Sequence, residues 1–305
     1  MNKIIITAGE AYTDIDTLAC AIAYKKLLDL KNINSEVLLP GPLNDSISKT
    51  IRTWNFSYKT NINANDYSYI LVDTSNPRAI SKHVRINKII EVYDHRWGFG
   101  DFWKQKIGNK AVIDQVGACA TLIWEKFKEN NLQDQIDEVS ANLLYVSIIS
   151  NTFNLKAQIT SDRDILSIEE LKNHISLTKG WLSIYFNEIS ESVLNDPENA
   201  IRNDTKVEKI DGTDYSISQI ELWDSKKFID QHRDLIERLL GSSPYPNSFL
   251  TSPSISEGKN YIISLNKETR DNLSKAIGAQ FEGNLGFTNK LWLRKEIIRE
   301  LKKYV

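Results

Sequence analysis

The chain has 305 residues, of which 41% are hydrophobic and 26% charged, and its formal net charge is −2. This composition is typical of a soluble globular protein, and the near-neutral charge excludes a general electrostatic preference for nucleic acid or an anionic membrane. No apolar run approaches the roughly 20 residues that a membrane span needs, and the sequence opens on a strand pattern without a charged and then apolar leader. We therefore expect a cytoplasmic protein with two domains, each large enough to bury its own core.

The N-terminal segment carries the most informative local pattern. Residues 4–6 are three isoleucines and predict a strand, and apolar residues at helical spacing between positions 20 and 28 predict a helix. Asp14 and Asp16 fall between the two, where carboxylates at the carboxyl end of a strand suit a hard divalent cation. An Asp before a helix is also an ordinary N-cap residue, so this segment alone leaves metal binding and helix capping both open.

Acidic side chains recur after the next two predicted strands. Residues 69–72 form an apolar run that ends in Asp73, and the strand pattern of residues 88–93 leads into Asp94 and His95. The carboxyl ends of parallel strands meet at one edge of a sheet, and carboxylate and imidazole groups are metal ligands. Three such ends in consecutive strand and helix units predict a metal site.

The rest of the first half continues the alternation of strands and helices. Strands are predicted at residues 35–39 and 111–113, and helices at 117–127, 139–149 and 181–194. The helix at 117 opens on small residues, which allow either close approach of an anion to the backbone or tight packing against the sheet. Cys20 and Cys119 lie in apolar helical patterns and are expected to be buried without a chemical role.

The second half begins after residues 195–199, a polar stretch with a proline that we expect to be a linker. A hairpin is predicted from residues 206–210 and 215–222, then a helix at 226–240, a loop rich in Ser and Pro at 241–258, a strand at 261–265, a helix at 267–277 and a strand at 291–293. Arg294 and Lys295 follow that last strand, where they can clamp a phosphate or belong to a solvated helix face. The predicted fold class is α/β: a mostly parallel sheet flanked by helices in residues 1–190 and a smaller mixed-sheet α/β domain in residues 200–305.

The order of these motifs resembles the DHH phosphoesterases, in the branch with a DHH-associated C-terminal domain that includes the family II, manganese-type inorganic pyrophosphatases and the prune-like exopolyphosphatases. The resemblance covers nearly the whole chain. The similar segments are residues 9–24, Val72-Asp73, Asp94-His95-Arg96, Ser150-Asn151-Thr152, residues 217–221 and Arg294-Lys295.

The resemblance implies a hydrolase of phosphoanhydride or phosphoester bonds that acts on pyrophosphate, short polyphosphate or a nucleotide in a cleft between the domains. It implies two Mn²⁺ ions, or Mg²⁺ or Co²⁺ in their place, one on Asp14 and Asp73 and the other on Asp16, Asp73 and His95. Positions 10 and 151 also correspond to metal ligands of the family. The resemblance further implies catalytic roles for Asp73, His95 and Arg96, and substrate binding by Arg294 and Lys295.

This chain departs from the pyrophosphatase pattern at four positions. It has Glu10 and Arg96 where those enzymes have His, Asn151 where they have Asp, and Leu293 where they have Ser. These changes weaken the expectation of efficient pyrophosphate hydrolysis and leave open a catalytically weakened protein that binds a phosphate ligand or a nucleotide. A related nuclease or cyclic-dinucleotide hydrolase is less favoured, because those relatives usually carry a Gly- and His-rich second domain that is not found here.

The partners expected from the sequence and the resemblance are few. We expect a small phosphorylated substrate, no membrane association and no stable complex with nucleic acid. The oligomeric state stays open, and a homodimer is compatible with the sequence.

Overall fold

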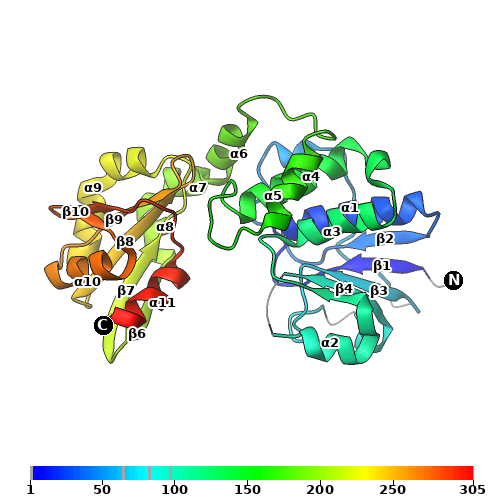
Figure 1. Cartoon of the computed structure of the whole chain (residues 1–305), viewed down its shortest axis with the longest axis horizontal. Helices are drawn as coiled ribbons and strands as arrows, with labels where there is room; N and C mark the ends of the chain where they lie inside the picture. Colours follow the sequence, from blue (N-terminus) through cyan, green and yellow to red (C-terminus); the bar gives the residue numbers. More distant parts are fainter. Residues whose placement is uncertain (1–2, 64–65, 82–83, 96–97, 305) are drawn as a thin grey trace. The chain divides into compact units, whose positions relative to one another are not determined.

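The structure, a computed structural model, describes residues 3–63, 66–81, 84–95 and 98–304. It divides into two compact units (Figure 1). The first unit comprises Met1–Leu155 and Ile159–Lys179, and the second comprises Lys156–Gln158 and Gly180–Val305.

The first unit is built on a parallel sheet of five strands in the order β2-β1-β3-β4-β5. The strands are β1 (Ile4–Thr7), β2 (Ser35–Leu38), β3 (Ser68–Val72), β4 (Ile89–Asp94) and β5 (Ala111–Ile113). The helices are α1 (Ile15–Leu30), α2 (Gly100–Ile107), α3 (Cys119–Glu129), α4 (Glu138–Asn151) and α5 (Asp162–Leu171), with short 3-10 turns at Ile51–Thr53, Ile86–Lys88, Gly108–Lys110 and Gln133–Gln135.

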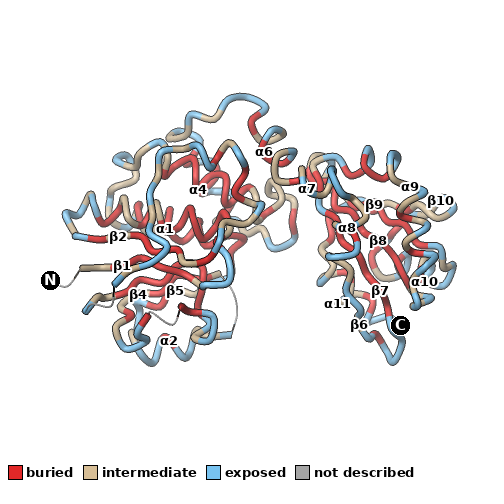
Figure 2. Tube along the Cα trace, turned by 180° about the vertical axis from the view of Figure 1, so that it is seen from behind, coloured by how far each residue is buried: buried red, intermediate tan, exposed pale blue. Residues whose placement is uncertain are grey.

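Strand side chains of the first unit pack against helix α2. Ile5, Leu71 and Val92 pack with Trp103 of α2 in one core cluster. Helices α1 and α4 are buried over most of their surface, as the red segments of Figure 2 show, because both lie inside the unit rather than on its outer face. Small residues in α1, among them Ala19 and Cys20, allow this close packing between helices.

The second unit contains a mixed sheet of six strands in the order β10-β11-β9-β8-β7-β6. The strands are β6 (Thr205–Ile210), β7 (Thr213–Gln219), β8 (Asn247–Ser254), β9 (Lys259–Ile263), β10 (Gln280–Glu282) and β11 (Leu285–Phe287), and only the β7–β8 pair is parallel. The helices are α6 (Trp181–Ile189), α7 (Glu191–Asn195), α8 (Pro197–Asn203), α9 (Ser225–Gly241), α10 (Lys267–Ile277) and α11 (Arg294–Tyr304).

Helices cover both faces of this second sheet. On one face Ile236 and Leu240 of α9 pack with Leu250 of β8, and on the other Leu273 of α10 and Ile297 of α11 belong to a second core cluster. A parallel sheet in the first unit and a mixed sheet in the second confirm the predicted fold class.

Four predicted elements differ in the structure. The loop expected at 241–258 contains the buried strand β8, and the strand expected at 291–293 is irregular chain before α11. The helix expected at 181–194 is divided into α6 and α7 by Ser190, and most of the expected linker at 195–199 lies in α8, whose first residue is Pro197. Within the part of the chain that the structure describes, none of the helices is long and apolar enough to cross a bilayer.

Candidate metal centre

Asp16 lies in the first turn of α1 and is almost completely buried, with 1% of its surface exposed. Its carboxylate accepts hydrogen bonds from the backbone N–H groups of Cys119 and Ala120, at 2.8 and 2.9 Å, and from the Ser147 hydroxyl at 2.7 Å. The two amides belong to the first turn of α3, where the helix dipole favours a negative charge. The Asp16 side chain is therefore held in position by two other helices, α3 and α4.

This contact explains the small residues at the start of α3. The anion that its amides bind is the Asp16 side chain, so these N–H groups are already occupied. Tight packing also applies, because a Cβ atom on Gly117 would lie 2.4 Å from Thr152 Cγ2 and 2.9 Å from Asp164 Oδ2. The Gly117 N–H donates to the same Asp164 carboxylate at 2.8 Å, which fixes the chain just before α3.

Asp73 follows β3 directly and has a backbone φ of +52°, a left-handed conformation that is uncommon for residues other than glycine. Its N–H donates to the carbonyl of Tyr93, so the pairing of β3 with β4 extends to this residue. The Thr17 hydroxyl donates to Asp73 Oδ2 at 2.8 Å. The side chain is 2% exposed and points toward α1 rather than into solvent.

His95 follows β4 and is oriented by the carbonyl oxygen of Val116, which lies 3.2 Å from its Nδ1. A carbonyl only accepts, so Nδ1 carries the proton in this contact and the lone pair of a neutral ring lies on Nε2. Nε2 is 3.5 Å from Asp73 Oδ1 and 3.7 Å from Asp16 Oδ2. In known metal sites, a hydrogen bond from the other ring nitrogen to a carbonyl oxygen orients a metal-binding histidine in the same way.

Asp16, Asp73 and His95 thus form one cluster in which the three ligand atoms all lie within 4.8 Å of one another. Two carboxylates and one imidazole, all largely buried, are a donor set for a divalent cation such as Mn²⁺. The three residues come from the start of α1 and from the carboxyl ends of β3 and β4, which the parallel sheet brings to the same edge.

Asp14 and Glu10 lie beside this cluster without joining it. Asp14 is the N-cap of α1, and its Oδ1 accepts the N–H of Thr17 at 2.9 Å. Glu10 is exposed. Both line a cavity of about 770 Å³ together with Asp73 and Arg78, so negative and positive side chains face one space next to the cluster.

The remaining predicted residues are placed as follows. Asn151 is the last residue of α4, and its amide Nδ2 donates to the Ser147 carbonyl at 3.1 Å within its own helix. Arg96 lies outside the described residues.

The pKa values of Cys20 and Cys119 are raised by burial, that of Cys119 to about 12, so both stay protonated thiols at neutral pH.

Arg294 opens α11 and does not follow a strand. Its Nη2 lies 2.8 Å from Asp204 Oδ1, its Nη1 donates to the Asp204 carbonyl at 2.5 Å, and only 11% of its side chain is exposed. In this conformation the guanidinium connects α11 to Asp204, the residue that follows α8. Lys295 is exposed.

Sequence reasoning missed the residues that orient the cluster. Thr17 directly follows Asp16, and its hydroxyl was the one signal available in the sequence. Ser147 and Val116 gave no signal, because each reaches the site from a helix or loop far away in the sequence.

Comparison with known proteins finds sequence similarity to inorganic pyrophosphatases. The chain is 31% identical over 173 residues to a probable manganese-dependent inorganic pyrophosphatase of Lactobacillus delbrueckii subsp. bulgaricus, a match that covers 53% of this chain and about half, 52%, of that relative. It is 22% identical over 308 residues to the manganese-dependent inorganic pyrophosphatase of Bacillus subtilis, which covers 97% of this chain and 96% of that one. No family model matches the chain.

Two solved structures share the fold. One is a putative family II inorganic pyrophosphatase of Methanococcus jannaschii, with 20% identity, 99% of each chain covered and a TM-score of 0.58. The other is an exopolyphosphatase-related protein of Bacteroides fragilis, with 13% identity, 99% of this chain and 92% of that chain covered, and a TM-score of 0.55. The chain is therefore similar in sequence to manganese-dependent inorganic pyrophosphatases and has the fold of these two structures.

Proposed function

We propose that this chain is a DHH-type phosphohydrolase that uses divalent cations, Mn²⁺ foremost, to hydrolyse pyrophosphate. The observation that carries the proposal is the buried cluster of Asp16, Asp73 and His95 at one edge of the parallel sheet. The similarity to pyrophosphatases named as manganese-dependent supports the choice of metal and of substrate. Short polyphosphates and nucleotides carry the same phosphoanhydride bond and are the substrates to compare.

The donor set fits the proposed cofactor. Asp16, Asp73 and His95 would hold one ion, and Asp14 with Asp73 would hold a second, because both carboxylates border the same cavity. Glu10 lines that cavity as well and adds a carboxylate suited to a hard cation. When bound, divalent ions supply a water activated near neutral pH and offset the negative charge of phosphoryl oxygens.

The chain's own residues keep the ligands in place for this chemistry. The α3 amides and Ser147 hold the Asp16 carboxylate group in position, Thr17 orients Asp73, and the Val116 carbonyl directs Nε2 of His95 toward the two carboxylates. Such pre-orientation reduces the rearrangement that binding requires.

Cationic side chains are proposed to meet the charge on the substrate. Arg78 borders the cavity in the first unit. Arg294 and Lys295 of the second unit are proposed to bind phosphate, which requires Arg294 to exchange its hydrogen bonds with Asp204 for the substrate oxygens. Arg96 is proposed as a further cation at the reacting phosphate.

The test is phosphate release by the metal-stripped protein after reconstitution with Mn²⁺, Mg²⁺ or Co²⁺, with pyrophosphate, tripolyphosphate and ATP as substrates. Asp73→Asn should lose both metal binding and turnover, whereas the matched exposed change Asp134→Asn should keep both. Wild-type protein that binds Mn²⁺ with micromolar affinity and releases no phosphate from any of the three would overturn the hydrolase. That result would favour the phosphate-binding protein that Glu10 and Asn151 suggest.

A further inference from the structure

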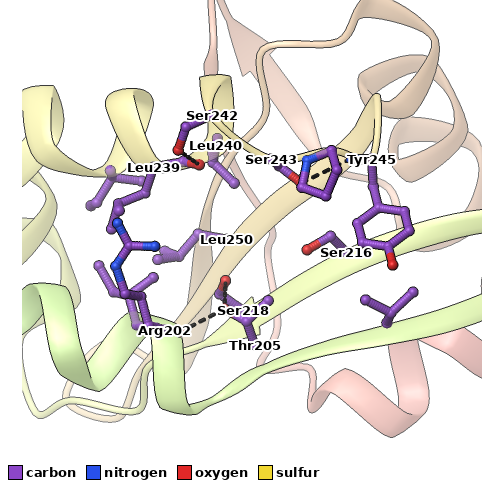
Figure 3. Close-up of a pocket in the computed structure, with 14 residues that line it drawn as sticks. Arg202, Thr205, Ser216, Ser218, Leu239, Leu240, Ser242, Ser243, Tyr245 and Leu250 are labelled. Carbon is purple, nitrogen blue, oxygen red and sulfur yellow. Dashed lines mark hydrogen bonds between the residues drawn. The ribbon is translucent and has the colours of Figure 1, made fainter.

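The second unit contains a cavity of its own, about 290 Å³ in volume, under the C-terminal end of α9 (Figure 3). Its floor consists of the cross-strand pairs Val207 with Ser216 and Thr205 with Ser218, on β6 and β7. A sheet face covered by a helix usually carries large apolar side chains, and the small serines at these positions leave space. The cavity therefore follows from the residue types on β7.

The walls of this cavity are mainly apolar. Leu250 of β8 joins the floor, and Ile201 of α8 with Ile236, Leu239 and Leu240 of α9 line the sides. Figure 3 shows the ring of Tyr245 at the side opposite Arg202. An aromatic ring and aliphatic side chains around one space suit the flat faces of a ring compound.

The Ser216 hydroxyl is the polar group of this cavity that indicates a ligand. The residue is 8% exposed, and within the described parts of the chain its hydroxyl forms no hydrogen bond. Figure 3 shows this hydroxyl directed toward the middle of the cavity. The neighbouring Thr205 and Ser218 hydroxyls are 2.7 Å apart and bond to each other, so Ser216 is the one of the three left to bind a ligand.

The charges around the cavity favour an uncharged ligand. Arg202 is the charged residue among those that line it, and its Nε and Nη2 already donate to Glu198 at 3.1 and 2.9 Å. Its side chain is 56% exposed, which weakens its attraction for an anion. The carbonyl end of α9 on the other side also disfavours negative charge.

We propose that this cavity binds an uncharged ring compound of nucleobase or nucleoside size that has hydrogen-bonding groups on its edge. The apolar walls and Tyr245 cover the ring, and Ser216 bonds the edge. The site belongs to the second unit and uses none of the residues of the metal cluster, so it is independent of the proposed hydrolase.

The test is a titration of the full-length, isotope-labelled protein with adenosine, followed by amide chemical shifts. We expect saturable shifts at cavity residues, weakened about 2- to 10-fold by Ser216→Ala, as for one hydrogen bond between uncharged groups. Val207→Trp, at a position of the cavity floor that is 47% exposed, should fill the space and abolish binding. Ser274→Ala on the exposed side of α10 is the matched control and should change nothing.

Three results would overturn the proposal. The first is the absence of saturable shifts at the cavity with adenosine. The second is a gain of tenfold or more in affinity with AMP, which would assign the site to an anion. The third is unchanged binding in Val207→Trp, because a ligand inside the cavity cannot tolerate that side chain. Phosphate release from pyrophosphate should be the same in all three variants, which separates this test from that of the hydrolase.

Discussion

Replacing Ser147 by alanine tests whether the buried hydrogen bonds to Asp16 prepare it to bind a metal. Ser147 is completely buried in α4, and its hydroxyl donates to Asp16 Oδ1 at 2.7 Å. A hydrogen bond to a charged group contributes about 1.5–3 kcal/mol, and alanine returns roughly 0.5 kcal/mol through its higher helix propensity. We expect Ser147→Ala to lower the free energy of unfolding by about 1–2.5 kcal/mol in the presence of a chelator.

The second effect of Ser147→Ala is on metal affinity. Changes in groups that orient a ligand typically weaken binding about 10- to 100-fold. Stabilisation by saturating Mn²⁺ should then fall by a further 1.4 kcal/mol or so for each tenfold loss of affinity. Urea unfolding with and without Mn²⁺, together with calorimetric titration of Mn²⁺, measures both effects.

Ser140→Ala is the matched control in the same helix. Ser140 is 1% exposed, and its hydroxyl has no hydrogen-bond partner among the described residues, so this change should leave Mn²⁺ affinity unchanged. If Ser147→Ala lost stability but bound Mn²⁺ within twofold of the wild type, the hydroxyl would support only the fold. Ser147 would then have no part in positioning Asp16 for a cation.

Three further predictions concern stability. Gly117→Ala should cost about 1–3 kcal/mol in urea unfolding through overpacking, because its Cβ would lie 2.4 Å from Thr152 Cγ2, and an unchanged midpoint would contradict this. Hydrogen bonds from Lys3 and Lys59 lower the pKa of Glu36, so its contribution, under about 1 kcal/mol, is present above pH 4.5 and lost as the pH falls through the lowered pKa. Glu36→Gln should therefore flatten the acid limb of the stability curve, and an identical limb would refute the assignment. Chelation of Mn²⁺ should lower the melting temperature of the wild type and leave that of Asp73→Asn unchanged, as measured by circular dichroism.

The sequence predicted the parallel sheet well because it contains short apolar runs, two of which, β3 and β4, lead into an acidic residue. Strand β8 was missed, since Ser and Pro usually mark loops. In the structure the serine hydroxyls of β8 form hydrogen bonds: Ser252 donates to the Ile220 carbonyl and Ser248 donates to the Leu240 carbonyl. Pro253 fits because its carbonyl, not its missing N–H, makes the contacts to Leu222 and Ser225.

The parts of the site that sequence reasoning could not supply depend on tertiary contacts. Ser147 and the residues that supply the α3 amides are more than 100 positions from Asp16 in the sequence. No local sequence pattern predicts contacts at that separation. Arg294 was expected to project from a strand end, and it instead begins a helix and pairs with Asp204. An apolar run of only three residues is compatible both with a strand and with irregular chain before a helix.

The way the fold treats its two buried aspartates explains why a cation would bind there. Burying Asp16 as a carboxylate is costly, and the fold offsets this with two amides at a helix N-terminus and a hydroxyl. Asp73 is held within reach of the same imidazole in a left-handed backbone conformation that itself costs free energy. Two buried carboxylates beside one imidazole repel each other, and a divalent ion held by Asp16, Asp73 and His95 would offset that repulsion. Metal binding would therefore offset the free energy that it costs to hold these groups together. For this reason the cluster favours a cation more strongly than the same three ligands would on a flexible chain.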